Sequence, residues 1–191
     1  MSSLNFAKRE IAAALARGVR QCVLVGARQP LRDDLQASAD QSVRLFTVDE
    51  HRQPDSPDTF IPTQFAHEGL ADALEKSDFD TRKASLFLWL GGVGYRTADA
   101  ALSSLAFIAS LPKGSGIVFD YAVERASLGS LAHTALDALA SRMLTASGTV
   151  KYLIQPPAVM ALLRGLGFHQ IVDRTKEGLP VTGEHLVSAV V

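Results

Sequence analysis

The chain has 191 residues and a formal net charge of −1, with 47% hydrophobic and 20% charged residues. This length and composition are typical of one soluble globular domain with a sizeable core, so we expect residues 1–191 to form a single domain. The near-neutral charge supplies no basic surface for nucleic acid, and no apolar run approaches the ~20 residues needed to cross a bilayer. We therefore expect neither a nucleic-acid partner nor a membrane.

Cysteine usage and the amino terminus predict the compartment. Cys22 is the single cysteine, which excludes an internal disulfide, and no signal-peptide core follows Met1. These features predict a cytoplasmic protein. The five histidines are scattered and none lies at ligand spacing from Cys22, so we expect no metal site.

Apolar runs of strand length alternate with helical patterns along the chain. In chain order the patterns predict a helix over 4–17, a strand over 22–26, a helix over 31–37, strands over 43–48 and 60–63, a helix over 69–76, a strand over 84–90, a helix over 98–110, a strand over 116–121, helices over 131–144 and 157–166, and strands over 168–173 and 185–191.

This alternation predicts an α/β fold with a parallel sheet and right-handed crossovers. The last two strands are joined by the short turn 175–183, so they form an antiparallel hairpin. Five parallel strands and a terminal hairpin, in the order 3-2-1-4-5-7-6, are the Rossmann-like layout of class I S-adenosylmethionine (SAM)-dependent methyltransferases. A six-stranded dinucleotide-binding sheet is built differently.

The turn after the first predicted strand begins Gly26-Ala27-Arg28. Open α/β sheets bind ligands outside the carboxyl ends of their strands, so this turn is a candidate cofactor site. Gly26 and Ala27 let backbone pass beneath a ligand, or simply permit a sharp turn. A nucleotide-binding turn usually carries a second glycine where this chain has Arg28. Arg28 either fills the groove, binds an anion at the helix start or faces solvent.

Acidic and small residues end two further strands. Asp49 follows the second strand, where a carboxylate can accept both ribose hydroxyls of a nucleoside, and Glu50 is the neighbouring candidate. Asp49 could equally cap the next turn. Gly91 and Gly92 follow the fourth strand and admit a ligand close to the backbone, or form a flexible turn. Tyr95 beyond them lines an acceptor pocket or packs under the next helix.

Five motifs, in order and at matching spacing from about residue 7 onward, resemble one family. They are Gly18-Val-Arg-Gln-Cys-Val-Leu-Val-Gly-Ala27, Leu45-Phe-Thr-Val-Asp49, Leu88-Trp-Leu-Gly-Gly-Val-Gly-Tyr95-Arg-Thr97, Pro112-Lys-Gly-Ser-Gly-Ile-Val-Phe-Asp-Tyr121, and a segment running from Thr145-Ala-Ser-Gly148 to Gly165-Leu-Gly-Phe168. Together they resemble the leucine carboxyl methyltransferases, which are class I SAM-dependent O-methyltransferases.

The resemblance implies O-methylation of a small carboxylate or hydroxyl acceptor, with SAM as cofactor and Tyr95 at the catalytic centre. It implies cofactor contacts from residues that follow the strands: Gly26, Ala27, Arg28, Asp49, Glu50, Gln64, Phe65, Gly91 and Gly92. Gln64 stands where the family has an aspartate for the adenine amino group, and its amide can still accept a hydrogen bond. Aligning acceptor and sulfonium supplies much of the rate, and a carboxylate acceptor requires no base.

The chain also departs from the family. The second glycine and the aspartate of the first turn are replaced within residues 28–32, and most of the N-terminal region that shapes the family's substrate pocket has no counterpart. These departures favour an alternative function, in which a degenerate methyltransferase fold binds no SAM and serves as a binding module for a protein partner. Both functions allow a homodimer.

Overall fold

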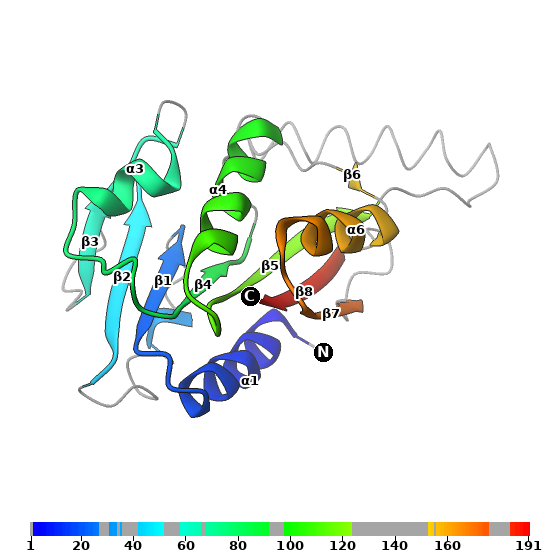
Figure 1. Cartoon of the computed structure of the whole chain (residues 1–191), viewed down its shortest axis with the longest axis horizontal. Coiled ribbons are helices and arrows are strands. Elements are labelled where there is room, and N and C mark those ends of the chain that lie inside the picture. Colours follow the sequence, from blue (N-terminus) through cyan, green and yellow to red (C-terminus); the bar gives the residue numbers. More distant parts are fainter. Residues whose placement is uncertain are drawn as a thin grey trace.

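The computed structural model describes residues 2–26, 31–33, 35, 42–51, 58–65, 68–91, 98–123, 153–154, 156–175 and 184–191. In these ranges one mixed sheet lies between helices that cover both of its faces (Figure 1). No helix of the described ranges is long and apolar enough to span a bilayer.

The sheet confirms the predicted strand order. Its strands are β1 (Gln21–Val25), β2 (Arg44–Asp49), β3 (Thr59–Pro62), β4 (Ser85–Trp89), β5 (Gly116–Val123), β6 (Leu153–Ile154), β7 (Gln170–Thr175) and β8 (Glu184–Val190). They run in the order β3-β2-β1-β4-β5-β8-β7 (Figure 1). Strands β1 to β5 are parallel, and β8 lies antiparallel between β5 and β7. The two-residue β6, which pairs with the end of β5, was not predicted.

The described helices also lie where the patterns predict them. They are α1 (Ser3–Ala16), α3 (Leu70–Glu75), α4 (Ala98–Ser110) and α6 (Pro156–Leu166). The bounds of α4 match the prediction, and α6 begins one residue earlier, at a proline that the first turn of a helix tolerates. Residues 31–33 and 35 are helical, within the helix predicted over 31–37. The predicted helix 131–144 and most of the turn 175–183 lie outside the described residues.

Two hydrophobic cores flank the sheet. All five residues of β1 are buried, as expected for a strand covered on both faces. Val23 and Val25 join the core beneath α3, α4 and α6, whereas Cys22 and Leu24 join the core beneath α1. The apolar positions of α1 that face this second core recur at helical spacing, at Phe6, Ala7, Ile11 and Ala14.

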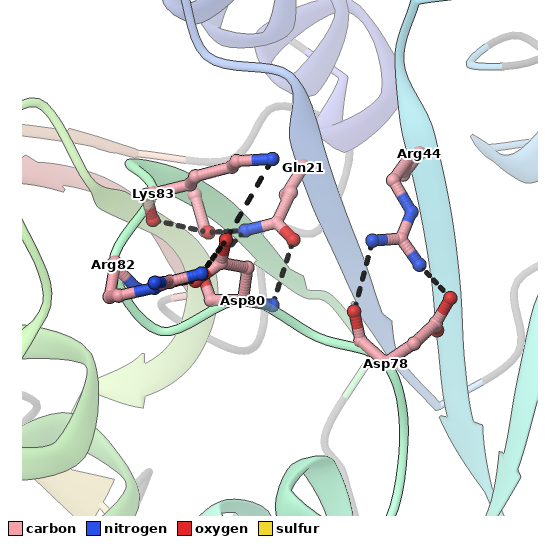
Figure 2. A network of polar contacts seen from close by, with 7 residues as sticks. Gln21, Arg44, Asp78, Asp80, Arg82 and Lys83 are labelled. Carbon is pink, nitrogen blue, oxygen red and sulfur yellow. Dashed lines mark hydrogen bonds and ion pairs between the residues drawn. The ribbon is translucent and has the colours of Figure 1, made fainter.

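Gln21, the first residue of β1, is buried and forms a network of hydrogen bonds (Figure 2). The Gln21 amide nitrogen donates to the Asp80 carbonyl at 2.9 Å and to Ser85 Oγ at 3.0 Å, while its Oε1 accepts the Asp80 N–H at 3.0 Å. The Ser85 N–H donates in turn to Ser115 Oγ at 3.1 Å. The Asp80 carboxylate accepts from Arg82, which lowers the pKa of Asp80 to about 2. Gln21 thus joins β1 to the loop that enters β4.

Replacing Gln21 with leucine should cost about 1–3 kcal/mol of unfolding free energy, because the loop groups would stay buried without partners. Urea unfolding of Gln21→Leu measures this loss. Gln170→Leu is the matched control, since Gln170 is exposed on β7. Equal unfolding midpoints for the two variants would show that the network contributes nothing.

Candidate functional site

The carboxyl ends of the parallel strands meet at one edge of the sheet. Past the end of β1, the Gly26 N–H donates to the Val48 carbonyl at 2.9 Å. Past the end of β3, the Thr63 N–H donates to the Asp49 carbonyl at 3.0 Å. These bonds continue the strand ladders into the turns, so Gly26, Asp49 and Thr63 lie side by side at this edge.

Glycines occupy left-handed backbone conformations in two of these turns. Gly26 has a φ of 78° and Gly91 a φ of 98°, backbone angles that residues with a Cβ rarely adopt. The Gly91 N–H donates to Asp120 Oδ1 at 2.8 Å, which ties the turn after β4 to the neighbouring β5. Sequence analysis did not single out Asp120 as a site residue, although it stands within the Phe-Asp-Tyr segment of the fourth motif.

Asp49 is half-buried at the end of β2 and already caps a turn. Its Oδ1 accepts the His51 N–H at 3.1 Å, which is the capping role that the sequence left open. A carboxylate offers about four lone-pair positions. The bond to His51 occupies one of these positions.

Glu50 and Gln64 line an open pocket of about 610 Å³ beside the ends of β2 and β3. The other lining residues are Pro62, Thr63, Glu68, Asp72 and Lys76. Three carboxylates face one ammonium group here, so the pocket suits neutral or cationic ligands that donate hydrogen bonds. Sequence analysis did not predict the pocket wall formed by α3 and the residues that flank it, although Glu68, Asp72 and Lys76 recur at a spacing of four residues.

Hydrogen bonds and an ion pair hold this wall in place. Lys76 pairs with Glu68, and this contact raises the pKa of the lysine. Asp72 Oδ2 accepts the Gly69 N–H at 3.4 Å, a contact that caps the start of α3. The pocket wall is therefore built largely from groups that also stabilise the helix.

The remaining predicted site residues divide into buried and undescribed ones. Phe65 is 7% exposed and packs in the core beneath α3 and α4, so a cofactor contact from it stays a prediction. Ala27, Arg28, Gly92 and Tyr95 lie outside the described residues.

The described residues contain neither a candidate metal site nor a reactive cysteine. No cluster of three His, Cys, Asp or Glu side chains that could hold a metal ion occurs in this part of the chain. Burial raises the pKa of the Cys22 thiol to about 12, so the thiol stays protonated and unreactive.

Alanine at Gly91 should destabilise the fold by about 1–3 kcal/mol, because the left-handed conformation strains a residue with a Cβ. Chemical unfolding of Gly91→Ala measures the loss. The control is Gly165→Ala in α6, where an added Cβ meets nothing within 4 Å. It should stabilise the helix by about 0.5–1 kcal/mol. A Gly91→Ala protein as stable as the wild type would contradict the need for glycine in this turn.

Comparison with known proteins places this site in a recognised fold. No protein-family model and no curated protein matches the chain. A DUF574 family protein from Streptomyces avermitilis aligns with 98% of this chain and 82% of its own, with a TM-score of 0.67 and 15% identity. A SAM-dependent methyltransferase from Archaeoglobus fulgidus aligns over 98% and 94%, with a TM-score of 0.60 and 13% identity.

A third similar structure is the 1,6-didemethyltoxoflavin-N1-methyltransferase of Burkholderia thailandensis, solved with S-adenosylhomocysteine bound. It aligns with 98% of this chain and 77% of its own, with a TM-score of 0.60 and 15% identity. At these identities the likeness concerns the fold alone. The chain therefore has the sheet and topology of class I SAM-dependent methyltransferases.

Proposed function

We propose that this protein is a SAM-dependent methyltransferase that methylates an oxygen of a small carboxylate or hydroxyl acceptor, and that it is a divergent relative of the leucine carboxyl methyltransferases. The observation that supports it best is the position of Asp49. This carboxylate ends β2 at the same sheet edge as Gly26, and its neighbour Glu50 lines a pocket with Gln64.

The described residues fit the groups that SAM would present. Asp49 and Glu50 offer carboxylate oxygens to ribose hydroxyls, and the Gln64 amide offers an acceptor to the adenine amino group. Gly26 and Gly91 leave the backbone uncovered at the strand ends. SAM, when bound, would supply a methyl group activated by its positively charged sulfur. The protein's contribution would be to bind and align the two reactants.

A second candidate function is a methyltransferase-like fold that binds no SAM and instead engages a protein partner or a second copy of itself. One observation favours it, which is the replacement of the expected glycine by Arg28.

Calorimetric titration with SAM and S-adenosylhomocysteine tests the first proposal directly, and we expect binding of both. The Asp49→Asn variant should keep the wild-type stability, because its amide retains an oxygen that accepts the His51 N–H while the negative charge is lost. Its affinity should fall roughly 10- to 100-fold, as expected when hydrogen bonds to a charged group are lost.

The control is Asp78→Asn, because Asp78 is exposed and pairs with Arg44 at the start of β2, the opposite end of that strand. It should bind like the wild type. Equal affinities for Asp49→Asn and wild type would remove Asp49 from the site, and no heat with the wild type at millimolar ligand would refute the proposal.

The variant Arg28→Gly separates the two candidate functions. If Arg28 fills the cofactor groove, the wild type should bind no SAM and the glycine variant should regain binding, because the groove would be vacated. Thermal shift with S-adenosylhomocysteine reads out both proteins in one experiment. Binding by the wild type at micromolar ligand would eliminate the second candidate.

A further inference from the structure

Three polar side chains from strands far apart in sequence meet near the end of β5. The Tyr121 hydroxyl donates to Asp173 Oδ2 at 2.7 Å, and His185 Nδ1 lies 2.7 Å from Asp173 Oδ1. The Tyr121 and His185 rings also contact each other, with centroids 5.4 Å apart. Tyr121 lies on β5, Asp173 on β7 and His185 on β8.

This triad lies at the same sheet edge as the candidate cofactor site. Tyr121 pairs directly with His185 across β5 and β8. The residue before it, Asp120, accepts the Gly91 N–H and so holds the turn after β4. Asp120 and Tyr121 project from opposite faces of β5, so this bond does not itself bring the triad to the turn. The triad lies at the same sheet edge, with Tyr121 on the strand next to β4.

The contacts set the roles of the three groups. Burial and the hydrogen bond to Asp173 raise the pKa of Tyr121, which keeps the phenol protonated as a donor. An ionised carboxylate only accepts, so the His185 ring presents Nδ1–H to Asp173. In the neutral ring this orientation leaves Nε2 as the nitrogen with the free lone pair, as in other carboxylate–histidine pairs.

The His185 side chain is partly exposed. Within the described part of the chain, His185 Nε2 has no hydrogen-bond partner and is not among the buried polar atoms that lack one. The side chain of His185 keeps 20% of its surface exposed, and that of Asp173 keeps 15%. The titratable groups of the described residues that contact the His185 ring are Tyr121 and Asp173.

We propose that His185, held by Asp173 and Tyr121, accepts the proton of a hydroxyl group on the methyl acceptor. This inference rests on the proposed methyltransferase function and narrows its substrate class. A carboxylate acceptor is already ionised and needs no base, whereas a phenol or enol must lose a proton as it is methylated. An oriented base at this edge therefore favours a hydroxyl acceptor.

Proton transfer and methyl transfer balance in one step. The acceptor O–H proton moves to His185 Nε2 while the oxygen forms a bond to the methyl carbon of SAM. The bond between sulfur and that carbon breaks, and its electron pair returns to sulfur to give S-adenosylhomocysteine. Asp173 stabilises the imidazolium, which then releases the proton to water.

The same contacts would also serve a purely structural role, because they join β5, β7 and β8. His185→Asn separates the two roles. The asparagine amide can still donate to Asp173 as Nδ1–H does, but it carries no basic nitrogen. The matched control is His169→Asn, since His169 is exposed and precedes β7 at the opposite sheet edge.

The probe is 4-nitrophenol, whose anion is coloured, titrated into the wild type and both variants with and without S-adenosylhomocysteine. In the wild type and in His169→Asn, we expect bound probe to ionise at a lower pH than free probe, because its proton passes to His185. In His185→Asn this shift should vanish while urea unfolding stays unchanged.

Failure to bind the probe, or the same shift in His185→Asn as in the wild type, would overturn the inference. An unfolding midpoint that falls in His185→Asn together with an unaltered shift would assign the triad to structure alone. The proposed methyltransferase function is tested separately, by calorimetry with S-adenosylhomocysteine. The two results can be distinguished because 4-nitrophenol is also titrated without S-adenosylhomocysteine.

Discussion

The burial of β1 along its whole length is the constraint on which the rest of the structure depends. A strand covered on both faces needs a helical layer on each side, and its alternate residues enter separate cores. Parallel pairing with β2 and β4 then brings the carboxyl ends of neighbouring strands to one edge. The candidate site is a direct consequence of this pairing, because turns with different side chains emerge there next to one another.

Apolar periodicity predicted the bounds of α4, and the short turn before the last strand predicted the terminal antiparallel pair. The strand order followed from the match between this layout and the class I methyltransferase fold. Sequence patterns could not predict β6, which has two residues and therefore no period. Nor could they predict that the neighbouring residues Gln64 and Phe65 occupy different environments. Both follow β3, yet one lines the pocket and the other enters the core, and that choice depends on the path of the chain beyond the strand.

The Tyr121–Asp173–His185 triad was unpredictable for a different reason. Its members are separated by 52 and 12 positions in sequence, and they meet because β8 pairs with two partners at once. A shift of one residue in either pairing would turn the side chains to the opposite face. A pattern within one sequence does not specify the register of β8 with β5 and with β7 at the same time.

Two different chemical environments therefore share one edge of the sheet. The ends of β2 and β3 carry an acidic pocket suited to hydrogen-bond donors, whereas β5, β7 and β8 carry an oriented histidine. The turn at Gly91 lies between them and is fixed to β5 through Asp120. Under the proposed function, the acidic half would bind the methyl donor and the half with the histidine would bind the acceptor.

The insertion of β8 between β5 and β7 has a consequence for biosynthesis. During translation, β5 emerges with one side unpaired, and its permanent neighbour follows only after residues 124–183 have been made. A nascent chain at that stage presents an open row of backbone N–H and carbonyl groups, which is a template for pairing with another polypeptide.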